Sequence, residues 1–178
     1  MRVPTCLFAV SMLTAAGLAV PHAKADAPLP PPQDKTVCSQ NGAFCAVMDA
    51  GSVRTNVVKD GKVLWSMPGW FRDAHLADDG EHLVVGYQGL GLLQWDYRPQ
   101  TTLITFWRRG RLLRRVPLSE VIEDTDNLEL TVSHFRWGRT LGIDGQGRFL
   151  VHTVEDRRMA FDIESGKLLE AWPAPFDR

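Results

Sequence analysis

Short runs of alternating apolar and polar residues follow one another from Thr36 to the end of the chain. The runs are rich in Val, Ile, Leu and aromatic residues, and dipeptides that favour turns separate them. Alternation with a period of two places every second side chain on the same face of a strand. The pattern therefore predicts an all-β domain over residues 36–178.

The expected strands are short and cover most of this domain. They span residues 44–49, 53–58, 63–67, 71–76, 82–87, 92–97, 103–108, 112–116, 130–136, 140–143, 149–154, 159–163 and 168–172. Residues 118–124 favour a helix instead, because Pro117 precedes them, Ser119 can cap the first turn, and Glu120 suits the positive end of the helix dipole.

A small motif built on glycine turns occurs three times along the chain. The opening turns are Asn41-Gly42, Asp79-Gly80 and Gln146-Gly147, and the closing turns are Asp60-Gly61, Arg109-Gly110 and Ser165-Gly166. Glycine at such positions supplies the positive φ that a tight turn needs. Because each unit has an apolar face that only a neighbouring unit can cover, the repeat predicts stacked β-sheet units.

The third copy has the fullest form of the motif. Residues 144–151 read Asp-Gly-Gln-Gly-Arg-Phe-Leu-Val, and residues 161–169 read Phe-Asp-Ile-Glu-Ser-Gly-Lys-Leu-Leu. This copy resembles one blade of a β-propeller of the WD40-like or quinoprotein-like type. In the second copy, Trp95-Asp96 falls where the WD dipeptide of such blades would stand. The resemblance implies antiparallel β-sheet blades and a broad binding face.

The first 25 residues have the pattern of a signal peptide. Arg2 precedes an apolar run at residues 7–20, and Ala23-Lys24-Ala25 gives a small-x-small cleavage pattern. The run is shorter than the roughly 20 apolar residues that span a bilayer, although an uncleaved anchor remains the alternative. Residues 26–35 carry four prolines, which favour an extended linker. The sequence predicts an exported protein that is secreted or periplasmic.

The length of the chain limits the number of blades. Four blades of about 40 residues need roughly 160 residues, whereas 153 residues follow the expected cleavage site. The opening glycines are 38 positions apart between the first two copies and 67 between the next two. This difference places an insertion at about residues 117–139. We therefore expect three propeller-like antiparallel blades, in an open or incomplete propeller with a short helical insertion.

Charge and hydropathy restrict the partners. The formal net charge is −1 for the whole chain and about −3 after cleavage, because Arg2 and Lys24 leave with the signal peptide. This balance gives no basic field for a nucleic acid. After residue 25, we expect no transmembrane segment, since no apolar stretch there is long enough.

Cys38 and Cys45 are the cysteines of the mature sequence. If the turn at Asn41-Gly42 closes a hairpin, the two cysteines face each other across it. Directly opposed residues have Cα atoms about 4.5–5.5 Å apart, which is within disulfide geometry. Exported proteins meet an oxidising compartment, so the sequence predicts a disulfide; a metal site or a reactive thiol is the alternative.

Two groups of residues could carry chemistry. The first contains Asp73, His75, Asp78, Asp79, Glu81 and His82, whose types suit a metal ion. The turn at Asp79-Gly80 and the alternation of strand residues would separate them. Ser133 and His134 suggest a hydrolase, but adjacent strand residues point to opposite faces and would not bond to each other. We therefore expect no catalytic residue, no metal site and no cofactor.

A loop and an arginine-rich hairpin predict a binding surface. The expected binding residues are Trp70, Phe71, Arg72, Asp73, Arg108, Arg109, Arg111, Arg114 and Arg115. Arginine pairs bidentately with carboxylate and phosphate groups. The expected partner is therefore a protein, an anionic glycan or a lipid headgroup. The alternative interpretation is a solvated sheet edge, in which the arginines pair with Glu120, Glu123 and Asp124.

These features predict a non-catalytic binding module of the cell envelope or the extracellular space. Two alternatives remain. One is a small hydrolase or lyase that acts on envelope glycans with carboxylates such as Asp73, Asp78 or Asp144. The other is a structural subunit, in which two three-blade arrays close one propeller as a homodimer.

Overall fold

Three four-stranded antiparallel sheets make up the body of the protein, and the strand order in each sheet follows the sequence. The computed structural model describes residues 28–177, so the predicted signal peptide lies outside the described residues. Blade 1 contains β1 (Lys35–Cys38), β2 (Cys45–Asp49), β3 (Arg54–Lys59) and β4 (Lys62–Pro68). Blade 2 contains β5 (Ala74–Leu76), β6 (His82–Val85), β8 (Thr102–Arg108) and β9 (Arg111–Pro117). Blade 3 contains β12 (Gly138–Ile143), β13 (Arg148–Thr153), β14 (Arg157–Asp162) and β15 (Leu168–Pro173).

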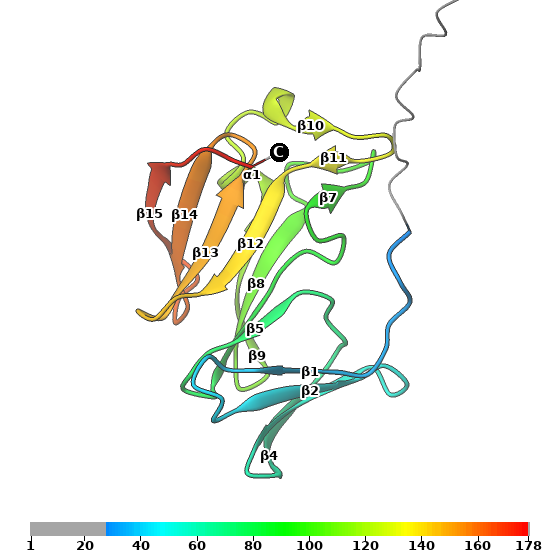
Figure 1. Ribbon diagram of the computed structural model, residues 1–178, viewed down its shortest axis with the longest axis vertical. Coiled ribbons are helices and arrows are strands. Elements are labelled where there is room, and N and C mark those ends of the chain that lie inside the picture. Colours follow the sequence, from blue (N-terminus) through cyan, green and yellow to red (C-terminus); the bar gives the residue numbers. More distant parts are fainter. Residues whose placement is uncertain (1–27, 178) are drawn as a thin grey trace, which may run out of the picture.

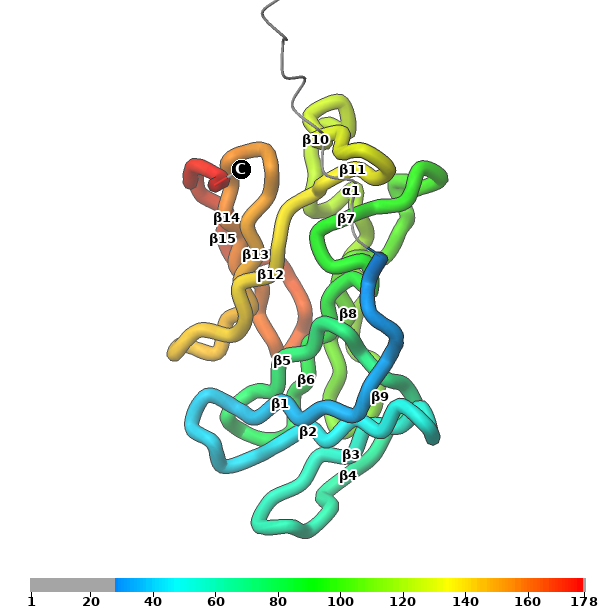
Figure 2. Tube along the Cα trace, turned by 45° about the vertical axis from the view of Figure 1, so that its right-hand side comes forward, coloured from blue at the N-terminus to red at the C-terminus, as the bar shows by residue number. Residues whose placement is uncertain are grey.

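The three blades fan out from their first strands. The first strand of each blade is an edge strand, and β5 lies between β1 and β12 at the centre of the fan. The last strands, β4, β9 and β15, form the outer edges (Figures 1 and 2). Among residues 28–177 no sheet closes on itself. The prediction of three propeller-like blades in an open array is therefore confirmed.

The antiparallel order divides the connections between two edges of the array. Every turn between first and second strands, and between third and fourth strands, lies at one edge, which we call the turn edge. The turn edge contains all six glycine turns of the sequence motif: Asn41-Gly42, Asp60-Gly61, Asp79-Gly80, Arg109-Gly110, Gln146-Gly147 and Ser165-Gly166. The opposite edge, which we call the loop edge, carries the Trp70–Asp73 loop, residues 86–101 and residues 118–137.

Two apolar cores join the blades. Between blades 1 and 2 the buried side chains include Met48, Met67 and Leu83. Between blades 2 and 3 they include Phe106 of β8 and Phe149 of β13, whose rings meet edge to face at 6.0 Å. Each blade thus covers the apolar face of its neighbour, as the repeat predicts.

Two loop-edge segments of blade 2 form a small extra sheet. It joins β7 (Leu92–Leu93), β10 (Glu129–Leu130) and β11 (Phe135–Arg136), in the order β10-β11-β7. The predicted strand at 92–97 is thus shorter, and the predicted strand at 130–136 is a hairpin. The single insertion predicted at 117–139 is instead one of two extended loops, the other being residues 86–101. The core residue Trp137 fixes them together, because its Nε1 donates to the Leu90 carbonyl at 2.8 Å.

Other boundaries also differ from the predictions. Helix α1 (Leu118–Val121) is shorter than predicted, because Glu155 accepts the next free amides, those of Glu123 and Asp124, at 3.0 and 2.9 Å. The short 3₁₀ helix η1 (Thr125–Asn127) follows. Strand β5 begins at Ala74 rather than at residue 71. Strand β1, absent from the predicted strands, begins at Lys35 inside the predicted linker. The interior of a strand is easier to recognise than its ends, where side-chain contacts decide.

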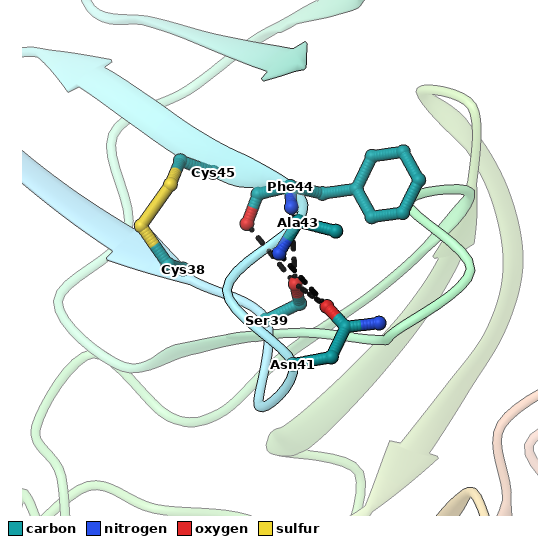
Figure 3. The surroundings of a disulfide bond; sticks show 6 residues. All are labelled: Cys38, Ser39, Asn41, Ala43, Phe44 and Cys45. Atoms are coloured by element: carbon teal, nitrogen blue, oxygen red, sulfur yellow. Dashed lines mark hydrogen bonds between the residues drawn. A yellow bond between two sulfur atoms is a disulfide. The ribbon is translucent and has the colours of Figure 1, made fainter. Parts of the chain in front are cut away.

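The hairpin between β1 and β2 holds the predicted disulfide. Cys38 and Cys45 are paired in the strand register and joined by a disulfide (Figure 3). The turn between them is longer than a two-residue turn: the Gly42 amide donates to the Ser39 carbonyl at 2.9 Å, and the Ser39 amide donates to the Phe44 carbonyl at 2.8 Å. The side chain of Asn41 accepts from the Ala43 amide at 2.9 Å within the loop.

Replacing both cysteines with serine tests the energetic role of this disulfide. We expect a loss of about 2.5 kcal/mol in the free energy of unfolding, because the crosslink restricts an eight-residue loop of the unfolded chain. This loss corresponds to a melting temperature about 5–10 °C lower for a domain of this size. Thermal unfolding with and without reductant checks it: the reductant should lower the wild-type value and leave the serine variant unchanged. Equal melting temperatures for the two oxidised proteins would contradict the prediction.

Candidate functional site

A groove opens at the turn edge, where the first strands of the three blades end. It has a cavity of about 400 Å³. Blade 1 contributes Val37, Cys38 and Gln40, blade 2 contributes residues 75–79, and blade 3 contributes residues 142–145, Gly147 and Ile163. Since all three blades line it, the groove exists only in the assembled array.

The walls of the groove are apolar and its carboxylates belong to turns. Val37, Leu76 and Ile143 come from the three first strands. Asp144 accepts from the Gln146 and Arg148 amides, both at 2.9 Å, and from Arg148 Nε at 2.8 Å. Burial raises the pKa of Asp144, but these hydrogen bonds outweigh it and hold that pKa below its ordinary value.

The acidic and histidine residues at positions 73–82 form separate pairs. Asp79 Oδ2 lies 2.6 Å from His82 Nδ1, and Asp79 Oδ1 accepts from the Glu81 and His82 amides at 2.7 and 3.0 Å. Burial raises the pKa of Asp79, and the hydrogen bonds, chiefly from His82, bring the net shift below the ordinary value. Asp78 accepts from the Asn41 amide at 2.8 Å and so joins the turns of blades 1 and 2. Within residues 28–177, no group of three or more His, Cys, Asp or Glu residues could hold a metal ion.

Asp73 links the first strands of blades 2 and 3. Its Oδ1 lies 2.8 Å from His75 Nε2, and its Oδ2 accepts from Thr140 Oγ1 at 2.8 Å. The His75 ring packs against Phe149 with the ring centres 5.3 Å apart. Asp73 was predicted as a binding residue; the structure places its carboxylate between two blades, with both oxygens in hydrogen bonds.

The arginine hairpin projects from the turn edge, beside the turns that border the groove. Arg108 and Arg109 both pair with Glu81, and hydrogen bonds from Arg108 and then Arg109 hold the pKa of Glu81 below its ordinary value. Arg114 pairs with Glu120. The two remaining arginines of the cluster, Arg111 and Arg115, are exposed.

The loop predicted to join the arginines in one surface lies at the other edge. Trp70, Phe71 and Arg72 connect β4 to β5 at the loop edge, beside the described part of the Pro-rich linker. Trp70 is half-buried there. The structure therefore does not bring the two halves of the predicted binding surface together, because the antiparallel meander sends them to opposite edges.

One expectation about the hydrolase candidates is wrong. Ser133 Oγ lies 2.8 Å from His134 Nδ1, although a strand would have sent the two side chains to opposite faces. They stand instead in the turn between β10 and β11, which the Thr131 amide closes by donating to the His134 carbonyl at 2.9 Å. A turn of this kind can bring adjacent side chains together.

Sequence reasoning missed the apolar lining of the groove. Val37, Leu76, Ile143 and Ile163 are aliphatic residues at strand ends. In the sequence these four residues look the same as the aliphatic core residues near the ends of the remaining strands. The one usable signal was their position just before or after a turn of the motif, on all three copies.

The part of the chain that the structure describes has no helix long and apolar enough to cross a membrane.

Comparisons with known proteins find similarity among solved structures alone. No model of a protein family and no curated protein matches the chain. The β-propeller domain of Cps50 (Swd1) from Myceliophteria thermophila is 13% identical, with a TM-score of 0.44 over 80% of this chain and 43% of that chain. Hydrazine synthase from Kuenenia stuttgartiensis is 18% identical, with a TM-score of 0.40 over 80% and 38%. The WD40 β-propeller domain of Doa1 is 12% identical, with a TM-score of 0.37 over 75% and 37%. The chain spans less than half the length of these structures.

Proposed function

We propose that the protein is an exported, non-catalytic binding module of the cell envelope or the extracellular space, and that it binds a protein partner at the turn edge. The observation that carries this proposal is the groove that all three blades line. The pattern of residues 1–25 supports export, and the disulfide between Cys38 and Cys45 agrees with an oxidising compartment.

The size and chemistry of the groove suggest what it accepts. A cavity of about 400 Å³ lies within the range of ligand sites. Val37, Leu76 and Ile143 can surround an apolar side chain of the partner, while the carboxylates of the rim are held in their own turns. Arg111 is exposed next to the turn of the arginine hairpin and can pair with acidic groups that flank this apolar side chain in the partner. We therefore expect a partner segment with an apolar anchor and acidic flanks.

Filling the groove tests this proposal. Gly145 lines the groove in an exposed turn, and a Cβ atom there would meet nothing within 4 Å. The variant Gly145→Trp should therefore place a large ring in the groove without disturbing the core. Gly51 is an exposed turn glycine at the loop edge, so Gly51→Trp is the matched control.

The expected result is a difference between the two variants. The mature chain is used to capture proteins from an envelope extract, and the affinity of each captured protein is then measured with purified components. Gly145→Trp should weaken that affinity by about tenfold or more, equivalent to about 1.4 kcal/mol, while Gly51→Trp leaves it unchanged. Melting temperatures show whether both variants are folded. A partner that binds both variants as tightly as the wild type would exclude the groove as its site.

A second candidate, closure of a ring by two copies of this chain, is favoured by the packing between blades. The closing turn of each later blade touches the outer strands of the blade before it: a Cβ at Gly110 would lie 2.9 Å from the Ser66 carbonyl, and one at Gly166 would lie 2.8 Å from the Phe106 ring. At Gly61 of blade 1 the same position is open. The outer face of blade 1, turned away from blade 2, carries the exposed Val47. Light scattering decides this candidate, because a monomer at micromolar concentration contradicts it.

A further inference from the structure

We propose that the loop edge carries a recognition site for extended proline-rich segments. In the free chain, residues 28–34 of the chain itself occupy this site; a partner that presents a proline-rich segment binds by displacing them. The site is at the opposite edge from the groove, so it stands or falls independently of the proposal for the turn edge.

Two donors of the Trp70–Asp73 loop bind two backbone carbonyls of the proline-rich segment. Trp70 Nε1 donates to the Gln33 carbonyl at 2.8 Å, and Arg72 Nη2 donates to the Pro30 carbonyl at 2.9 Å. The accepting residues are three positions apart. A polyproline II helix has three residues per turn, so carbonyls with this spacing point to the same side. The two donors therefore match the repeat of a polyproline II ligand.

The ring of Trp70 is held in place by charged neighbours. The Arg72 guanidinium lies 5.2 Å from the ring centre and Lys35 Nζ lies 5.8 Å from it, both at cation–π distance. Lys35 Nζ also donates to the Arg72 carbonyl at 2.7 Å. The Gln88 side chain bonds to the backbone of the same loop, accepting from the Arg72 amide and donating to the Trp70 carbonyl, both at 3.3 Å. These contacts fix the orientation of the indole while residues 28–34 occupy the site.

Next to the site that residues 28–34 occupy lies an unfilled cavity. A cavity of about 560 Å³ lies beside Leu29, with Tyr87, Leu92 and Gln94 among its lining residues. Gln88 also lines this cavity and donates to the Trp70 carbonyl, so the cavity adjoins the Trp70–Asp73 loop. Grooves that contain aromatic side chains, here Trp70 and Tyr87, are the kind that binds proline-rich segments. The room beside Leu29 can take a bulkier side chain than leucine, which gives a partner segment a contact that the chain's own segment lacks.

Residues 28–34 are covalently joined to blade 1, so a partner segment must compete with them for the site. A ligand tethered by a short linker has an effective concentration in the millimolar range. A free segment of the same sequence would therefore bind the intact chain poorly. When the tethered segment no longer fits, the free segment should bind at its intrinsic affinity.

The experiment uses the full mature chain and a synthetic peptide with the sequence of residues 26–34, Asp-Ala-Pro-Leu-Pro-Pro-Pro-Gln-Asp. The variant P30G/P31G/P32G keeps the length of the segment and removes its polyproline preference. Binding is followed by the indole N–H signal of Trp70 in ¹H–¹⁵N spectra, which the variant Trp70→Phe assigns. We expect the peptide to shift this signal in P30G/P31G/P32G, with a Kd about tenfold or more below that for the wild type.

Controls separate this result from nonspecific binding. A peptide with every proline replaced by glycine should not shift the signal. In the P30G/P31G/P32G background, Trp70→Phe keeps an aromatic ring but loses the donor. Measured by isothermal titration calorimetry, which needs no Trp70 signal, this variant should bind the peptide about fivefold or more weakly. Trp95→Phe, at a 60% exposed residue, should have no effect. The proposal is overturned if the Trp70 signal does not respond, if the glycine peptide binds equally well, or if Trp70→Phe binds like Trp95→Phe.

A measurement on the wild type needs no folded variant. Because the Trp70 indole donates to the Gln33 carbonyl, its N–H should exchange with solvent about tenfold or more slowly than that of the exposed Trp95. Equal exchange rates would overturn the contact in the free chain.

Discussion

Replacing Phe106 with alanine is expected to lower the free energy of unfolding by about 3–5 kcal/mol, because it removes a fully buried ring and leaves a cavity. The Phe106 ring lies between blades 2 and 3, with the ring centres of Phe149 and Phe161 at 6.0 and 6.1 Å. Urea unfolding followed by tryptophan fluorescence measures the change.

The matched control is Leu169→Ala, at an outer-strand residue that is 56% exposed. Its expected effect is within about 0.5 kcal/mol, as for other surface substitutions. If Phe106→Ala costs less than about 1 kcal/mol, then blades 2 and 3 do not depend on this contact and the description of a shared core is wrong.

Replacing Gly80 with alanine is expected to cost about 2–5 kcal/mol, from two separate causes. Gly80 has a φ of +67°, where a side chain costs about 1–2 kcal/mol. In addition, the new Cβ would lie 2.3 Å from the Phe44 ring of blade 1, so that ring must move, which adds about 1–3 kcal/mol.

Gly42 isolates the second cause. It stands in the equivalent turn of blade 1 with a φ of +70°, and a Cβ there would meet nothing within 4 Å. Gly42→Ala should therefore cost the backbone strain alone, about 1–2 kcal/mol. Both costs are measured by urea unfolding, and Phe44→Ala should reduce the cost of Gly80→Ala to that of Gly42→Ala. Equal costs in the wild-type background would show that the turn of blade 2 does not press on blade 1.

The arginine hairpin shows how far charge patterning can be interpreted from the sequence. Five arginines in eight positions predicted a patch that attracts anions. In the structure Arg108 and Arg109 form salt bridges with Glu81, and Arg114 forms one with Glu120. Glu81 is distant in the sequence and becomes a neighbour only when the turn of β5 and β6 packs beside the turn of β8 and β9. The sequence could show the cations but not which of them would be paired.

Trp70 shows the same limit for a binding loop. Its place between Pro68-Gly69 and Phe71 marked it as a loop residue, and it lies in a loop. Its partner Gln33 is 37 positions away and belongs to a segment predicted to be a spacer. Nothing in the pattern of either segment indicates that they meet. The contact arises because residues 28–34, which precede β1, and the loop after β4 both lie at the loop edge.

The sequence by itself determined the three blades, the disulfide partners and the positions of the glycine turns. These depend on local properties: strand alternation, the positive φ of glycine, and the register of one hairpin. Tertiary structure alone decided which turns share an edge, that three blades form one groove, and that the predicted binding residues lie at opposite edges. Those features arise from the direction of each strand and the stacking of one blade on the next. Both bring together residues that are far apart in the sequence, and no local sequence pattern indicates that such residues are neighbours.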